Sequence, residues 1–268
     1  MTLRIYSPEK SGNTDTPALV WFHGGGFVLG SLETADPTCR ELVNRAGCTV
    51  VSVGYRLAPE HPFPAAVEDA YAATQWVEEK SDEIGISDKL AVGGDSAGGN
   101  LAAVVTHIAR DQKVLDDRKV DISLTSLEGD APSIDYQVLV YPAVNYLEPM
   151  DSYEENGEGY FLSFDEMAWF LHNYIDNPIH GRNPYAFPLQ AQNFENLPPA
   201  TVITSGFDPL RDEGEEYVEC LLDAGVEVEH SSYDDTIHGF FSMTFIGIER
   251  ADEAVEEVSD SLKKEFGL

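Results

Sequence analysis

The chain has few cysteines and no long apolar run. Three cysteines occur in 268 residues (Cys39, Cys48 and Cys220), and their odd number and scattered positions argue against a disulfide framework or a metal site. No apolar segment approaches the roughly 20 residues that a membrane-spanning helix requires. Residues 1–6 read directly as a strand, without a secretion signal before them. We therefore expect a cytoplasmic protein with reduced thiols, no bound metal and no membrane contact.

Basic residues are also scarce. Lys and Arg total 16 against 48 Asp and Glu, a formal net charge of -32. This balance disfavours nucleic acids and anionic membranes as partners. Disorder would explain such acidity, but the chain is 43% hydrophobic and 10% aromatic. Because the acidic residues are dispersed over the chain, we expect a halophilic protein whose surface repulsion is screened by concentrated salt.

The segment from Leu90 to Ala109 carries the strongest motif. A short apolar run leads into Gly94-Asp95-Ser96-Ala97-Gly98, and a stretch rich in helix formers follows. A serine between two such glycines on a strand-to-helix turn is typical of a nucleophile elbow. The alternative is a glycine-rich turn without chemistry, as in nucleotide-binding folds, so partners for Ser96 decide between the two.

Apolar runs of strand length alternate with helical segments along the chain. The expected strands cover residues 3–8, 18–22, 49–55, 90–92, 136–141, 200–206 and 226–233. The expected helices cover 36–46, 65–80, 101–109, 163–175, 209–224 and 249–266. This order predicts an α/β fold over residues 1–268, a single domain with a mostly parallel sheet flanked by helices.

Two segments interrupt the alternation. Residues 111–135 are polar and acidic, and we expect an extended surface excursion there. Residues 143–198 are too long for a plain loop between two strands, and aromatic residues are scattered among their acids. We interpret 143–198 as a lid inserted between late strands, over the strand ends.

Candidate partners for Ser96 follow it in the order that an elbow serine requires, first an acid and then a histidine. Asp208 and His238 each lie just beyond a predicted strand. Asp208 could instead be only the cap of the helix that follows it, and Asp212 is a rival acid one turn into that helix. We predict that His238 is the base and that Asp208 orients it.

A second glycine-rich turn, His23-Gly24-Gly25-Gly26, follows an earlier strand. Glycines there let the backbone approach a substrate and point N–H groups at a developing oxyanion. We predict an oxyanion hole formed by Gly25, Gly26 and Ala97, with His23 holding the loop. A phosphate-binding loop is the alternative, but no P-loop lysine or dinucleotide fingerprint accompanies these glycines.

Five motifs in order resemble the carboxylesterases related to hormone-sensitive lipase. They are His23-Gly24-Gly25-Gly26-Phe27, Tyr55-Arg56-Leu57-Ala58-Pro59-Glu60, Gly94-Asp95-Ser96-Ala97-Gly98-Gly99, Asp208-Pro209-Leu210-Arg211-Asp212 and His238-Gly239-Phe240. Gly-Asp-Ser-Ala-Gly is similar to the elbow of one branch of that family. The resemblance covers nearly the whole chain. It implies an α/β-hydrolase fold, hydrolysis of short-chain carboxylic esters and no cofactor.

The resemblance has two departures. Members of that family usually carry several tens of residues before the glycine loop, including helices of the cap, whereas His23 comes early here. The stretch 111–135 is also longer than the usual connection. We expect that half of the cap is missing, that the site is wide and shallow and favours short acyl groups, and that a homodimer buries part of the exposed apolar surface.

These observations predict a serine carboxylesterase that acts through an acyl-enzyme on a small-molecule ester. Two alternatives stay open. One is an amidase or peptidase that uses the same triad. The other is a non-catalytic small-molecule-binding protein on this scaffold, like the plant hormone receptors of the family, although these lose the histidine that is present here as His238.

Overall fold

The computed structural model describes residues 1–9, 16–114, 129–146 and 148–268. Residues 115–128 of the predicted acidic excursion therefore lie outside the described part. Among the described residues, no helix combines the length and the apolar character needed to cross a membrane. No grouping of His, Cys, Asp and Glu suited to a metal ion occurs in the same ranges.

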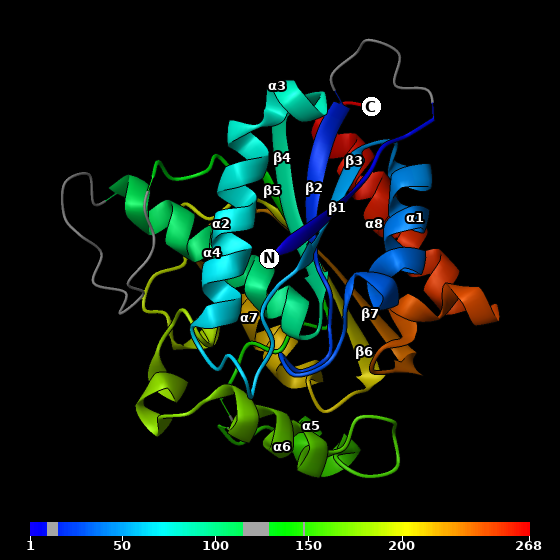
Figure 1. The fold of residues 1–268 in the computed structure, drawn as a ribbon. Helices are drawn as coiled ribbons and strands as arrows, with labels where there is room; N and C mark the ends of the chain where they lie inside the picture. Colours follow the sequence, from blue (N-terminus) through cyan, green and yellow to red (C-terminus); the bar gives the residue numbers. More distant parts are fainter. Residues whose placement is uncertain (10–15, 115–128, 147) are drawn as a thin grey trace.

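A seven-stranded sheet forms the centre of the molecule, in the order β1-β3-β2-β4-β5-β6-β7 (Figure 1). Only β1 (Thr2–Tyr6) runs antiparallel to its neighbour, β3 (Thr49–Gly54). Every other pair is parallel; the other strands are β2 (Thr16–Phe22), β4 (Ile86–Asp95), β5 (Tyr136–Val140), β6 (Ala200–Phe207) and β7 (Val228–Ile237). The predicted mostly parallel sheet is confirmed.

The two faces of the sheet bury separate apolar clusters. Along β2, Val20 and Phe22 face one cluster, whereas Leu19 and Trp21 face the other, as the two-residue period of a strand requires. Figure 1 shows α2 (Ala65–Glu79) and α4 (Ala97–Val114) on the first face. It shows α1 (Leu32–Ala46) and α8 (Glu249–Phe266) on the second, and α7 (Arg211–Asp223) adds to the first cluster.

Helix α1 begins earlier than predicted. The sequence suggested a start at Asp36, but Ser31 caps the helix by accepting hydrogen bonds from the N–H groups of Glu33 and Thr34. Pro37 lies inside the helix, within its first two turns, and Gly47 ends the helix at φ 71° as predicted. Pro37 is also compatible with a helix that starts at Asp36, because proline is common in the first turn of a helix. In the structure, the capping box formed by Ser31 and Thr34 places the first helical residue at Leu32.

The segment between β5 and β6 holds most of the remaining helices. It includes α5 (Asp151–Asn156), α6 (Phe164–Tyr174), η1 (Pro178–Arg182) and η2 (Pro188–Gln190). Outside it lie α3 (Ser81–Ile84) and η3 (Phe240–Ile246). Figure 1 shows α5 and α6 side by side beyond one end of the sheet. Helix α6 agrees with the predicted helix at 163–175, whereas α5 was not predicted because six residues carry no measurable period.

Candidate active site

Ser96 lies on a tight turn between β4 and α4. Its φ of 56° is in the left-handed region, which non-glycine residues rarely adopt. A Cβ at Gly94 or at Gly98 would lie closer than 3.0 Å to backbone atoms, including the Phe22 carbonyl oxygen. The two glycines therefore permit the turn, and the turn presents the serine hydroxyl at the end of the sheet.

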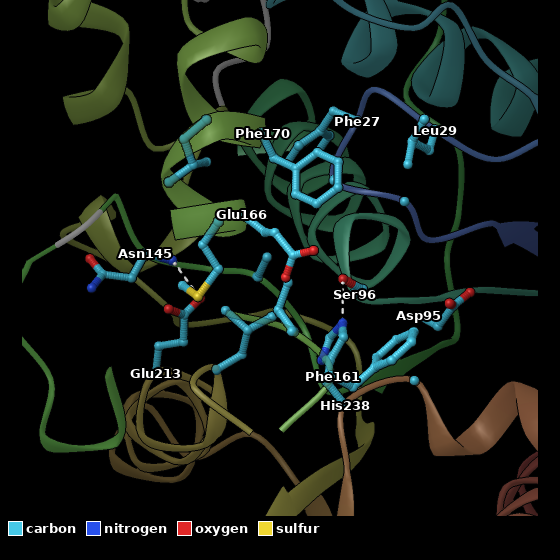
Figure 2. A pocket seen from close by; sticks show the side chains of 18 of the residues that line it. Phe27, Leu29, Asp95, Ser96, Asn145, Phe161, Glu166, Phe170, Glu213 and His238 are labelled. Carbon is cyan, nitrogen blue, oxygen red and sulfur yellow. Dashed lines mark hydrogen bonds between the residues drawn. The ribbon is translucent and has the colours of Figure 1, made fainter. Parts of the chain in front are cut away.

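His238 bridges Ser96 and Asp208. Its Nε2 lies 3.0 Å from Ser96 Oγ, and its Nδ1 lies 2.6 Å from Asp208 Oδ2 (Figure 2 shows the serine contact). Because a carboxylate only accepts hydrogen bonds, Nδ1 carries the proton and Nε2 is free to accept from Ser96. The three predicted residues are brought together in one hydrogen-bonded chain.

Asp208 faces His238, as predicted, but it does not cap α7, whose N-cap residue is Leu210. Asp208 is fully buried, and its Oδ1 accepts the N–H of Leu210 at 2.8 Å while Oδ2 faces His238. The rival Asp212 lies elsewhere, accepting from the Ser152 N–H and from Arg211. Both β6 and β7 extend further than predicted, so Asp208 and His238 each follow directly on the last residue of a strand.

The glycine loop lies against Ser96. Gly25 and Gly26 have φ of 119° and 58°, and within the described residues neither donates its N–H to a hydrogen bond. Ala97 opens α4, where first-turn N–H groups have no acceptor inside the helix. Gly25, Gly26 and Ser96 line the pocket, and Ala97 follows Ser96 directly in the chain; the oxyanion hole of these three N–H groups stays a prediction.

His23 supports this loop from behind. Its Nδ1 lies 2.7 Å from the Gly24 carbonyl oxygen, and its ring stacks on Tyr55 with centroids 4.3 Å apart. The Tyr55 hydroxyl donates to the His23 carbonyl at 2.6 Å. Burial lowers the pKa of His23, which keeps the ring neutral. The predicted structural role of His23 agrees with these contacts.

The pocket has a volume of about 380 Å³, and its walls are mostly apolar. Helix α6 and the residues just before it contribute much of the lining, namely Phe161, Leu162, Glu166, Met167, Phe170 and Leu171. Most of the remaining lining residues come from the loops after the strands: Gly25, Gly26, Phe27, Leu29, Ser96, Ala143, Asn145, Leu210, His238 and Gly239. The last three are Asp95 at the end of β4, Glu213 on α7 and Ser242 in η3. The predicted apolar surface at the glycine loop is only partly exposed, because Phe27 stacks on Tyr174 at 3.8 Å.

Glu213 is a buried carboxyl that was not predicted from the sequence. Its Oε1 accepts the N–H groups of Val144 (2.7 Å) and Asn145 (3.2 Å), and Oε2 accepts the Tyr153 hydroxyl. Burial raises its pKa to about 8, and the three hydrogen bonds only partly oppose that rise. No local pattern signals this role, because all of the contacts join segments 60 or more residues apart.

Asp95 lies beneath the glycine loop. Its Oδ1 accepts the Gly24 N–H at 3.0 Å, which ties the elbow to the loop. Desolvation raises its pKa to about 6, against the smaller lowering effects of Gly24 and His238. Tyr141 packs against His238, with the two ring centroids 4.7 Å apart. No local pattern in the chain predicts that Asp95 and Tyr141 lie near His238.

Comparisons with known proteins agree with this architecture. A family profile described as alpha/beta hydrolase fold matches residues 19–242. The carboxylic ester hydrolase LipN of Mycobacterium tuberculosis is 42% identical over 247 residues, which is 91% of this chain and 62% of LipN. An arylesterase of Saccharolobus solfataricus is 39% identical over 90% of this chain and 72% of its own length.

Solved structures give the same result. A hyperthermophilic esterase from the archaeon Pyrobaculum calidifontis superposes with a TM-score of 0.88 at 45% identity, covering 98% of this chain and 80% of the esterase. A thermostable esterase from Pseudomonas putida superposes with a TM-score of 0.90 at 35% identity, covering 99% and 79%. The chain therefore belongs to the alpha/beta hydrolase fold family and, within it, to the carboxylesterases related to hormone-sensitive lipase.

Proposed function

We propose that the protein is a serine carboxylesterase. The hydrogen-bonded chain from Ser96 through His238 to Asp208 is the observation that carries the proposal. Ser96 Oγ attacks the ester carbonyl while His238 Nε2 takes its proton, and Asp208 stabilises the imidazolium that results. The N–H groups of Gly25, Gly26 and Ala97 stabilise the tetrahedral oxyanion, each contributing about 3 kcal/mol in the transition state.

The same histidine completes the cycle. His238 donates its proton to the leaving alcohol, so that the acyl–oxygen bond breaks and the acyl group stays on Ser96. A water molecule then gives a proton to His238 and attacks the acyl-enzyme, which releases the acid and restores the serine. None of these steps requires a cofactor.

Ser96→Ala tests the proposal. We expect the variant to fold as the wild type does and to lose ester hydrolysis by about a thousandfold or more, with a similar loss for His238→Ala. Ser242→Ala is a matched control, because Ser242 also lines the pocket but its hydroxyl donates to the Gly239 carbonyl oxygen. An acyl-enzyme trapped on any residue but Ser96 would refute the assignment.

Ester and anilide substrates measured side by side distinguish the alternatives. Turnover of esters alone is the expected result, efficient turnover of anilides would favour an amidase or peptidase, and binding without turnover would favour a receptor. The 380 Å³ pocket suits small esters, so kcat/KM should fall as the acyl chain lengthens. A preference for long acyl chains would contradict this expectation.

The segment 143–198 acts as a lid in this proposal. Its helix α6 supplies one wall of the pocket through Glu166, Met167 and Phe170. We also propose a homodimer, since apolar side chains on α6 are exposed, among them Phe164 and Trp169. Sedimentation in molar salt tests the dimer, and a monomer at all concentrations would refute it.

Two further properties belong to the proposal. The three cysteines are unpaired and Cys39 and Cys48 are buried, which fits a reducing, cytoplasmic environment. The acidic surface fits a halophilic protein. The outer face of α8 exposes five acids, Glu249, Asp252, Glu253, Glu256 and Asp260, while its inner face buries apolar residues such as Val255 and Val258.

A further inference from the structure

The pocket beside Ser96 carries acidic side chains and lacks basic ones. Asp95, Glu166 and Glu213 line it, and among the described lining residues there is no Lys or Arg, so His238 is the only group that can become positively charged. A carboxylate beside Ser96 destabilises the transition state of ester hydrolysis, because negative charge develops there on the carbonyl oxygen of the ester. The acids therefore require an explanation.

Glu166 is the carboxylate that keeps its charge. Its Oε2 accepts the Ser163 N–H at 2.9 Å and the Ser163 hydroxyl at 2.7 Å, and these hydrogen bonds lower its pKa. Within the described residues its Oε1 accepts no hydrogen bond. Figure 2 shows the Glu166 side chain extending from α6 into the pocket.

The other two acids are engaged differently. Glu213 accepts three hydrogen bonds from the protein, and burial raises its pKa to about 8, which disfavours its charged form. Asp95 faces the Gly24 N–H behind the glycine loop. Glu166 is therefore the fixed negative charge that a bound substrate meets.

The surfaces next to Glu166 suit an alkylated cation. Met167 and Phe170 on α6 and Phe161 just before it line the same pocket, and Phe161 is 69% exposed, so its ring is accessible. Aromatic faces attract ammonium groups, and apolar walls accommodate their methyl groups. The charge and the lining thus favour the same chemical class.

We propose that this pocket prefers carboxylic esters that carry an alkylammonium group in their alcohol or acyl part, and that Glu166 is the counter-ion that selects them. The inference rests on the proposed esterase function. A substrate cation beside Glu166 compensates the negative charge of Glu166 while the oxyanion forms. An ester that also carries a free carboxylate is repelled by Glu166. Glu166 is thus a specificity-determining residue and takes no part in bond breaking.

Matched ester pairs test the proposal. The alcohol-side pair is acetylcholine and 3,3-dimethylbutyl acetate, and the acyl-side pair is ethyl 4-(trimethylammonio)butanoate and ethyl 5,5-dimethylhexanoate. In each pair a quaternary nitrogen replaces a carbon of the same shape. We expect the cationic ester of at least one pair to have a kcat/KM about fivefold higher than its neutral partner in the wild type. In Glu166→Gln this ratio should fall to about one.

Two controls isolate the pocket charge. Glutamine can replace glutamate in a capping box, so Glu166→Gln retains the helix start. Asp165→Asn removes the same charge from the same helical turn. Both carboxylates are exposed, but only Glu166 lines the pocket, so the ratio should stay at its wild-type value in Asp165→Asn. All variants are compared at one salt concentration, which equalises the long-range field of the protein.

The outcomes are separable. A cationic-to-neutral ratio of one or less for both pairs in the wild type overturns the proposal, as does an unchanged ratio in Glu166→Gln. The proposal is also overturned if the ratio falls in Asp165→Asn as much as in Glu166→Gln, or if it falls in Glu213→Gln but not in Glu166→Gln. Either result would mean that Glu166 does not select the cationic esters. If the wild type hydrolyses none of the four esters, it is the esterase function that fails.

Discussion

At the scale of single residues, Glu213 makes stability depend on pH. Its folded-state pKa of about 8 lies above the ordinary 4.5, so the native state binds the proton more tightly than the unfolded chain does. The resulting stabilisation is complete below about pH 4.5 and is lost as the pH rises through 8. Asp95 acts in the same direction, because its pKa rises from 3.8 to about 6 on folding; its stabilisation is lost as the pH rises through about 6.

We therefore expect the wild type to gain melting temperature as the pH falls from 8 to 5. Glu213→Gln should gain roughly 5 °C less over this interval, because a neutral amide no longer titrates. The test is a set of thermal scans at constant salt. Glu216→Gln on the exposed face of the same helix is the control and should follow the wild type. Parallel curves for Glu213→Gln and the wild type would contradict the prediction.

At the scale of elements, helix α6 contacts the glycine loop directly. A Cβ at Gly26 would lie closer than 3.0 Å to the Phe170 ring, and Phe27 stacks on Tyr174 of the same helix. The position of Gly25 and Gly26, the proposed oxyanion donors of this loop, thus depends on the packing of α6. A change in the helix should therefore affect catalysis even though α6 holds none of the triad residues.

Gly26→Ala should lower kcat about ten- to a hundredfold, because the methyl group displaces either the loop or Phe170. The double variant Gly26→Ala with Phe170→Ala should recover part of that loss, since the clash is with a side chain. At Gly98 the added methyl group meets the Phe22 backbone, so Gly98→Ala combined with Phe170→Ala should recover nothing. Steady-state kinetics on a short neutral ester measures these three variants and Gly98→Ala alone. A double variant no faster than Gly26→Ala would show that Phe170 does not limit the loop.

At the scale of the whole molecule, excess negative charge opposes folding. Basic residues are few, so one basic side chain can pair with several acids. Arg45, for example, forms ion pairs with Glu41, Asp252 and Glu256. Most acids elsewhere on the surface face water with no cation beside them among the described contacts. Screening lengths fall from about 10 Å at 0.1 M salt to about 3 Å at 1 M, so added salt should remove much of the repulsion.

The melting temperature should therefore rise steeply between 0.1 and 2 M KCl at neutral pH, and activity should follow the folded fraction. Scanning calorimetry measures the first and initial rates measure the second. Ser96→Ala is a useful control, because its melting temperature should show the same salt dependence without any turnover. A melting temperature that stays flat over this range would end the halophilic interpretation and leave the esterase proposal intact.

The sequence alone predicted the elements whose signals are local. The apolar runs of the central strands and the 3.6-residue period of α8 are local signals, and the bounds of α8 agree with the prediction. The elbow at Ser96 and the order of Asp208 and His238 also follow from local signals, because each residue lies where a strand ends. Such features depend on residues a few positions apart, which a single chain displays directly.

Only the tertiary structure decided which distant residues share the pocket. Glu166 and Glu213 lie on different helices that packing brings to Ser96, and no spacing in the chain encodes that approach. The same holds for Phe170 against Gly26. The start of α1 at Ser31 was missed for a different reason, since Asp36 is an equally good cap by residue type and only the backbone geometry distinguishes the two. Contacts of this kind depend on how whole helices and strands are placed relative to one another. That placement results from the packing of helices that buries both faces of the sheet.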